Sequence, residues 1–317
     1  MLRGLFRLLT ILLVINNSYS NSKDSTILFV GHAYGSHFDD DSKLDPVLLN
    51  FINTNNKILF DKIIFGGDFI YNCNDVTEIK NFKNSVSTFD YRFVIGNHEN
   101  CDKILEISKV NFGDFNYYEK QNDNLLIYLN TSSNYSKDKV KDMFDYIKNL
   151  IEKENPNNVV LFTHQVIFSK NDFYLRVNSR KFYDFGNNLY QMLYDDFNGI
   201  DTKFHFFSGD IGAFNYTPFA FFDNYDNFYL YAVGIGNKNN SKAILVNLGK
   251  DISVDFIDIN NSKIESKENY TSLKVQLYQL PKLLLFHIKS NIYIFAFLIL
   301  GLFYMYFKNS KFYVKKI

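Results

Sequence analysis

The chain has little cysteine, no tryptophan and no excess of charge of either sign. Its two cysteines exclude a disulfide-dense mini-protein and a four-cysteine zinc ribbon. The 34 lysines and arginines balance 34 aspartates and glutamates, so the basic surplus of a typical nucleic-acid-binding protein is missing, and we expect no nucleic-acid partner. Hydrophobic residues make up 46% of the 317 residues. That fraction supports a sizeable core and excludes bulk disorder.

The first 20 residues have the three-part pattern of a secretory signal peptide. Arg3 and Arg7 precede an apolar run over 8–15, and a polar stretch ends at Ser20. An uncleaved anchor helix is the alternative, but the run is short for a membrane span. We therefore predict a signal peptide over 1–20 and a body in the secretory lumen, in the periplasm or at the cell exterior.

The other end of the chain carries an uncharged apolar stretch over 291–307, followed at once by lysines. This pattern predicts a transmembrane helix over 291–307 and, by the positive-inside rule, a basic cytoplasmic tail over 308–317. A buried C-terminal core helix is the alternative. Residues 261–290, polar and then leucine-rich, are predicted to be a juxtamembrane stalk. The layout is that of a single-pass type I membrane protein.

Between these ends, short apolar runs alternate with helical patterns over 21–260, which predicts an α/β domain with central mixed sheets flanked by helices. After residue 219 the runs follow one another without helices. The helical pattern is clearest over 143–151, where apolar residues share one helix face. The predicted strands are Thr26–Val30, Lys62–Phe65, Arg92–Ile95, Val159–Phe162, Phe204–Phe207, Phe228–Val233, Ala243–Leu248 and Ile252–Ile257.

Each of the first five predicted strands is followed by a residue of a type that binds metal ions. One such residue alone would more often be a turn aspartate, a capping asparagine or a buried histidine, but five successive strand ends are hard to explain as turns. Ligands of α/β sheets gather at the carboxyl ends of the strands, and mixed oxygen and nitrogen ligands suit hard and borderline metal ions. The residues are His32, Asp68, Asn97 with His98, His164 and Asp210.

Several of these residues stand in motifs that resemble the calcineurin-like metallophosphoesterases. The strongest motif is Gly96-Asn97-His98-Glu99, and Gly66-Gly67-Asp68 and Thr163-His164 resemble two others. Gly67-Asp68-Phe69-Ile70-Tyr71 is similar to a signature of purple acid phosphatases, with their short tartrate-resistant-like branch closest in length. The resemblance covers about residues 25–250 and implies a layered metallophosphoesterase fold and the hydrolysis of phosphate esters.

The resemblance also implies a role for each matching residue. Asp68 would bridge two metal ions. Asn97 and His164 would bind the second ion, and Tyr71 would bind the first. His98 would stand by the leaving-group oxygen as a general acid, with Glu99 orienting it.

The departures from the family pattern predict two unequal metal sites. His32 stands where the family has an aspartate, and Asp210 and Gly212 stand where it has two histidines. Gly212 has no side chain to offer. We therefore expect one firm site, held by Asp68, Asn97, His164 and Asp210, and a second, weak site with Asp68, Tyr71 and His32. Divalent or trivalent ions fit, with iron, manganese and zinc equally compatible.

Two functions stay open. The first is a membrane-anchored, extracytoplasmic phosphoesterase of acid-phosphatase type, whose partners are a phosphate-ester substrate and the membrane. The second is a catalytically degenerate phosphatase fold that serves as a membrane anchor or scaffold for membrane or cytoplasmic proteins. Its layout resembles that of the glideosome-associated anchor of apicomplexan parasites. The intact motif at 96–99 favours the enzyme, whereas Gly212 and the basic tail favour the anchor.

Two modifications are also predicted. Cys73 and Cys101 follow the Asp68 and Asn97 motifs, and an oxidising compartment would join them in a disulfide. Asn-x-Ser/Thr sites at Asn134, Asn215 and Asn269 are candidates for glycosylation if the chain enters a pathway that carries it out.

Overall fold

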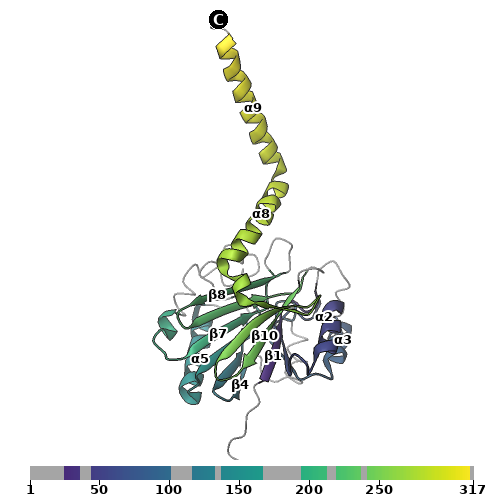
Figure 1. Ribbon diagram of the computed structural model, residues 1–317, viewed down its shortest axis with the longest axis vertical. Coiled ribbons are helices and arrows are strands. Elements are labelled where there is room, and N and C mark those ends of the chain that lie inside the picture. Colours follow the sequence, from purple (N-terminus) through teal and green to yellow (C-terminus); the bar gives the residue numbers. More distant parts are fainter. Residues whose placement is uncertain are drawn as a thin grey trace, which may run out of the picture.

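A computed structural model describes residues 25–35, 44–100, 116–132, 137–166, 194–212, 219–236 and 241–314. They form a body built on two β-sheets, from which two C-terminal helices project (Figure 1). The predicted signal peptide over 1–20 and the glycosylation sites at Asn134 and Asn215 lie outside the described residues.

The first sheet is mixed and has six strands. Its half formed by β1, β2 and β3 is parallel, whereas β1 pairs antiparallel with β10, and β10, β11 and β12 continue antiparallel. The order across the sheet is β12 (Lys263–Ser266), β11 (Ile252–Asp258), β10 (Lys242–Leu248), β1 (Ser25–Val30), β2 (Lys62–Phe65) and β3 (Tyr91–Phe93).

The second sheet is also mixed and also has six strands. The four central strands are parallel and each edge strand pairs antiparallel with its neighbour. The order is β4 (Tyr117–Gln121), β5 (Asn124–Tyr128), β6 (Asn158–Thr163), β7 (Lys203–Ser208), β9 (Phe228–Val233) and β8 (Ala220–Tyr225).

The two sheets pack face to face around a core rich in phenylalanine. The ring of Phe29 from the first sheet lies 5.7 Å from that of Phe162 and 5.8 Å from that of Phe207, both in the second sheet. Their side chains are fully buried. Burying one such side chain stabilises the fold by about 1.5–3 kcal/mol, so this interface contributes substantially to the stability of the body.

Helices cover the outer faces of both sheets. α2 (Pro46–Asn55) and α3 (Val76–Val86) share a hydrophobic cluster with the first sheet, and α5 (Lys137–Glu154) shares one with the second. α2 begins where it does because the Asp45 carboxylate accepts the N–H groups of Val47 and Leu48, and because Pro46 suits the first helical turn. The predicted α/β class, with two mixed sheets flanked by helices, is thus confirmed.

The body continues past residue 260, where the predicted domain boundary lies. β12 pairs with β11 and satisfies the backbone groups of what would otherwise be an edge strand. A 3₁₀ turn, η1 (Lys267–Tyr270), then leads into α8 (Ser272–Ser290) and α9 (Ile292–Val314). The predicted stalk over 261–290 is therefore part strand and part helix.

The predicted transmembrane helix over 291–307 overlaps α9 from residue 292 onward and is not supported. Among the helices of the described residues, none combines the length and the apolarity that crossing a membrane requires.

Cys73 is disulfide-bonded. The chain has one other cysteine, Cys101, so a bond within the chain requires the predicted pair. Cys101 itself lies outside the described residues.

Candidate functional site

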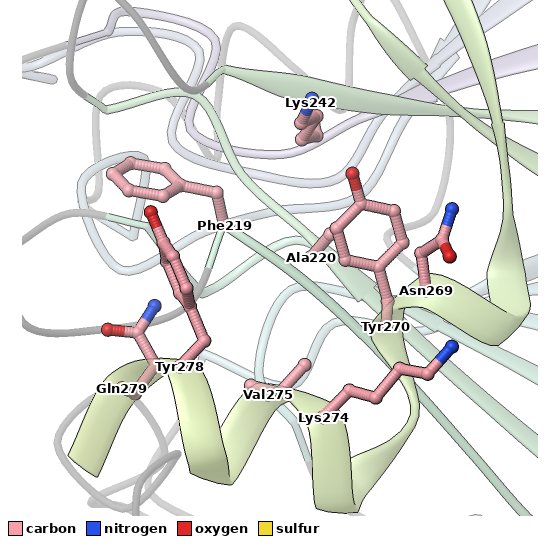
Figure 2. A pocket seen from close by; sticks show the side chains of 9 residues that line it. All are labelled: Phe219, Ala220, Lys242, Asn269, Tyr270, Lys274, Val275, Tyr278 and Gln279. Carbon is pink, nitrogen blue, oxygen red and sulfur yellow. The ribbon is translucent and has the colours of Figure 1, made fainter.

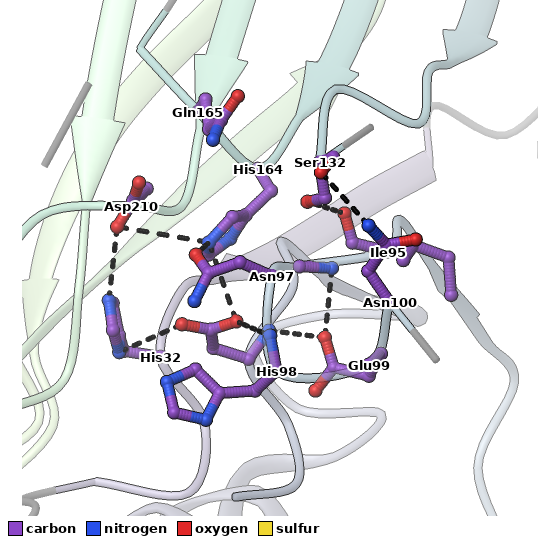
Figure 3. Close-up of polar contacts among 12 residues, drawn as sticks. His32, Ile95, Asn97, His98, Glu99, Asn100, Ser132, His164, Gln165 and Asp210 are labelled. Carbon is purple, nitrogen blue, oxygen red and sulfur yellow. Dashed lines mark hydrogen bonds and ion pairs between the residues drawn. The ribbon is translucent and has the colours of Figure 1, made fainter. Parts of the chain in front are cut away.

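The metal-type side chains predicted from the strand ends come together at one edge of the body (Figure 3). His32 follows β1, Asp68 follows β2, His164 follows β6 and Asp210 follows β7. All four are buried, and aspartates are rarely fully buried unless they are paired. The two sheets thus contribute to one site, because their parallel strands present their carboxyl ends on the same side.

His32, Asp68 and Asp210 form a cluster that could hold a metal ion. One ligand atom from each lies within 4.8 Å of the other two. His32 Nε2 is 3.3 Å from Asp210 Oδ1, and His32 Nδ1 is 3.6 Å from Asp68 Oδ2. Within the described residues, His32 Nδ1 and Asp68 Oδ2 have no hydrogen-bond partner although both are buried.

The protonation of His32 shows why a cation suits this cluster. Burial lowers the pKa of His32, and the charge of Asp68 only partly offsets that effect. A neutral imidazole carries one N–H and can donate to one of the two carboxylates, so its other nitrogen faces a carboxylate oxygen without a proton between them. A metal ion at this position would bind both lone pairs.

His164 has the orientation of a metal ligand. Its Nδ1 lies 2.8 Å from the carbonyl oxygen of Gly66, which can only accept, so Nδ1 carries the proton. Nε2 then turns its lone pair toward oxygens of Asn97 (3.1 Å), Asp68 (3.4 Å) and Asp210 (3.8 Å). A histidine whose second nitrogen donates to a backbone carbonyl is the usual arrangement around a bound metal.

Asp68 lies at the centre of the site and is ionised. Burial raises the pKa of its carboxyl, but His164, His32 and His98 together outweigh burial and hold the pKa below its ordinary value. Both His32 (φ 50°) and Asp68 (φ 52°) have left-handed backbones, a strained conformation that is concentrated at functional sites.

Gly67 makes room for His164. A Cβ at position 67 would lie 2.4 Å from His164 Nδ1, and the φ of 85° disfavours any side chain there. The glycine before Asp68 is therefore required by the position of the His164 ring as well as by the turn.

Glu99 holds the loop that carries Asp68, and not the His98 ring as the family resemblance implied. Its carboxylate accepts the backbone N–H groups of Asp68 (2.8 Å), Phe69 (2.8 Å), Ile70 (3.0 Å) and Gly96 (2.8 Å). Four donors surround its two oxygens, which leaves no room for the histidine. Burial, followed by the charge of Asp68, raises the Glu99 pKa to about 8, against these hydrogen bonds.

His98 is held by a backbone carbonyl instead. Its Nδ1 lies 2.7 Å from the carbonyl oxygen of Tyr71, so Nδ1 donates and Nε2 is left to point elsewhere. The rings of Tyr71 and Tyr34 each lie 5.2 Å from the His98 ring. His98 is half-buried, so a bound molecule could reach it. Binding of a metal by Tyr71 stays a prediction.

Position 212 supplies no ligand. Gly212 has a φ of 90°, and a Cβ there would lie 3.1 Å from both the Gly234 carbonyl oxygen and the Phe219 ring. A histidine would be strained at this position, so the second ligand of the family pattern is missing for a backbone reason. Asp210, two residues earlier, does join the cluster.

Two residues that support the loop after β3 carry no recognisable signal in the sequence. Asn100 donates its side-chain amide to the Ser132 carbonyl at 3.1 Å, and Ser132 Oγ donates to the Ile95 carbonyl at 2.8 Å. These bonds join the loop after β3 to the loop after β5 (Figure 3). Serine and asparagine are too common in loops for such a role to be recognised from sequence.

A separate cavity of about 390 Å³ lies at the base of α8, between that helix, η1 and β8 (Figure 2). Its lining includes Phe219, Tyr270, Lys274 and Tyr278. The cavity lacks the histidine–carboxylate grouping of the strand-end cluster, and we assign it no chemistry.

Two mixed sheets flanked by helices, with a histidine–aspartate cluster at the carboxyl ends of their strands, are consistent with a metallophosphoesterase-like fold. No known protein family and no curated protein matches the chain. Among solved structures, the chain is similar to GAP50, the anchor in the inner membrane complex of Plasmodium. The TM-score is 0.52 at 9% identity, over 81% of this chain and 94% of that one.

Two structures of Vps29 are more distant. Vps29 from Entamoeba histolytica, a single-site mutant, has a TM-score of 0.34 at 7% identity, over 76% of this chain and 97% of that one. Vps29 from Chaetomium thermophilum has a TM-score of 0.32 at 9% identity, over 74% and 95%.

Proposed function

We propose that the chain binds a metal ion at the strand-end cluster and hydrolyses phosphate esters there. The observation that carries the proposal is the pair of buried atoms, His32 Nδ1 and Asp68 Oδ2, that face each other at 3.6 Å without a hydrogen-bond partner in the described part of the chain. Asp68, His32 and Asp210 would hold the ion, joined by His164 and Asn97. A bound ion supplies charge stabilisation and lowers the pKa of a bound water.

His98 is the residue proposed to protonate the leaving group. Its Nδ1 bond to the Tyr71 carbonyl fixes the ring without using Nε2, which stays free to donate when the ring is protonated. The flanking Tyr71 and Tyr34 rings restrict its movement. Glu99 acts indirectly, because its carboxylate accepts the backbone N–H of Asp68 and so holds that residue in place.

The test combines metal analysis with turnover of an aryl phosphate by the full chain. We expect about one tightly bound divalent ion, and loss of both the ion and turnover in Asp68→Asn. His98→Ala should lower turnover by about 10²–10⁴-fold while the metal content is unchanged. Asp251→Asn, at an exposed carboxylate, is the matched control. Metal-dependent turnover that is unaltered in His98→Ala would refute the assigned mechanism.

A degenerate phosphatase fold acting as an anchor or scaffold is the second candidate. The similarity in fold to GAP50 favours the anchor proposal. So does Gly212, which has no side chain to bind a metal ion. In that case the wild type shows no turnover above background with manganese, zinc or iron, whether or not an ion is bound. In both proposals the body lies outside the cytosol and the chain associates with a membrane. Support for membrane association comes from the large apolar side chains exposed along α8 and α9.

A further inference from the structure

Helices α8 and α9 form an arm that leaves the body (Figure 1). Four leucines form a stripe along α8. Leu273, Leu277, Leu280 and Leu284 are exposed by 67, 64, 60 and 59%. Their spacing of four, three and four residues places them along one side of α8. Nothing in the described part of the chain covers this stripe, and a continuous exposed apolar surface of this kind marks an interaction site.

The stripe faces away from the body. Val275 and Gln279, which are 5% and 2% exposed, lie on another side of the helix and mark the surface that packs against the body. Between successive residues a helix turns by about 100°, so Val275 and Gln279 lie roughly opposite the leucines. The leucine stripe is therefore presented outward, where a partner can reach it.

The charge of the arm identifies the kind of partner. The sequence from 269 to 314 contains no aspartate or glutamate, whereas α8 alone carries Lys274, Lys282 and Lys289. Two copies of this helix would repel each other, which disfavours a second copy of the chain as the occupant. The three lysines lie on the side of α8 away from the leucine stripe, a side that also carries the exposed Tyr278 and Leu285. A surface of negative charge complements these lysines.

We infer that α8 lies on a lipid surface rich in anionic headgroups, with its leucine stripe at the acyl boundary and its lysines among the phosphates. Leucines on one face and lysines on the other are the pattern of an interfacial helix. Lys282 Nζ lies 4.1 Å from the centre of the Tyr278 ring, an amphipathic pair suited to the headgroup region. This inference deepens the membrane association proposed above, on which it rests, and does not depend on the metal cluster.

The absence of tryptophan from the chain allows a direct test. Leu280→Trp places one fluorophore on the stripe, and we expect its emission to shift to the blue with vesicles of phosphatidylcholine and phosphatidylserine at 7:3. Vesicles of phosphatidylcholine alone should give a much weaker shift at the same lipid concentration. The control is Ile58→Trp, at a body residue that is 76% exposed, whose emission should not change.

Lysine variants test the charge. A lysine near an anionic surface contributes about 1 kcal/mol, so replacing all three α8 lysines by glutamine should weaken binding to the 7:3 vesicles by about 10²-fold. Lys80, Lys141 and Lys250, exposed on the body, give the matched triple variant, which should bind like the wild type. High salt should weaken the wild type more than the lysine-deficient variant.

Three outcomes would overturn the inference. Equal affinity for both kinds of vesicle means that the lysines do not recognise lipid charge. Vesicle binding without a shift of the tryptophan at position 280 means that another segment carries the contact. A blue shift that grows with protein concentration in the absence of lipid identifies a second copy as the occupant. His98→Ala should bind vesicles like the wild type. Vesicle binding and phosphoesterase activity are therefore tested separately, and failure of one proposal does not imply failure of the other.

Discussion

Glu99 at the strand-end site and His205 in the second sheet are both buried polar side chains, but their surroundings differ. At the site, Glu99 is fully buried and its carboxylate accepts four backbone N–H groups. In the second sheet, His205 on β7 is 3% exposed, and within the described residues neither of its ring nitrogens has a hydrogen-bond partner. Its ring stacks on that of Tyr229 at 4.8 Å.

The difference lies in which charge state each environment permits. Burial, helped by the charges of Lys267 and Lys203, lowers the pKa of His205 to about 3, so the ring is neutral and packs as an aromatic group. At the site, burial raises the pKa of Asp68, but its interactions with His164, His32 and His98 outweigh burial and hold that pKa below its ordinary value. The site thus combines a buried carboxylate whose pKa is lowered with facing ligand atoms, whereas the interior holds the His205 ring in its uncharged form.

Removing the acceptor at the site should give the largest effect. Glu99→Ala leaves four backbone N–H groups buried without their acceptor, and each costs about 1–3 kcal/mol. We expect the free energy of unfolding to fall by about 4 kcal/mol or more, measured by urea denaturation. Glu152→Ala, at an exposed glutamate of α5, should change it by less than about 0.5 kcal/mol. Equal effects in the two variants would show that Glu99 is not required for the loop.

A pair of glycine substitutions separates crowding at the site from backbone strain. Gly67 and Gly199 have nearly the same φ, 85° and 89°, but a Cβ at 67 would meet His164 Nδ1 at 2.4 Å, whereas a Cβ at 199 would meet nothing within 4 Å. Gly199→Ala should cost about 1 kcal/mol from strain alone, and Gly67→Ala about 3 kcal/mol because His164 must also move.

The same pair should differ in metal binding. Calorimetric titration with zinc should show weaker binding in Gly67→Ala and unchanged binding in Gly199→Ala, because only the first substitution displaces a proposed ligand. If both variants unfold at the same urea concentration, the close approach of Gly67 to His164 does not contribute to the free energy of unfolding.

Much of the strand-end site could be predicted from the sequence because its signal is local. Buried parallel strands read as continuous apolar runs, and every predicted strand is present with bounds that differ by at most two residues at either end. The residues after those runs had to meet once the strands were parallel. His32, Asp68, His164 and Asp210 accordingly lie together.

Other features depend on partners that a local pattern does not contain. β4 and β12 carry polar or exposed residues and form strands because a neighbouring strand offers its edge. The role of Glu99 depends on where a loop 30 residues earlier places its N–H groups. In the sequence His205 lies in the predicted strand 204–207. Its lack of hydrogen-bond partners among the described residues follows from the packing of the two sheets.

The smallest expected effect concerns His205 in the second sheet and the dependence of stability on pH. His205 has a pKa of about 3 in the folded protein and about 6.5 when unfolded, so below about pH 6.5 the unfolded chain binds a proton that the folded chain excludes. Stability from this residue is therefore complete above about pH 6.5 and is lost as the pH falls toward 3. At pH 5 the loss is about 2 kcal/mol.

His205→Phe keeps a stacked ring and removes the titration. We expect the stability difference between pH 8 and pH 5, measured by urea denaturation, to be smaller in the variant by about 2 kcal/mol. The strand-end site is the same in both proteins, so its contribution cancels when the two differences are compared. Any misfit of the phenylalanine ring lowers stability equally at both pH values and cancels as well. An unchanged pH dependence would mean that His205 finds a proton acceptor in the folded protein, and the contrast between interior and site would no longer hold.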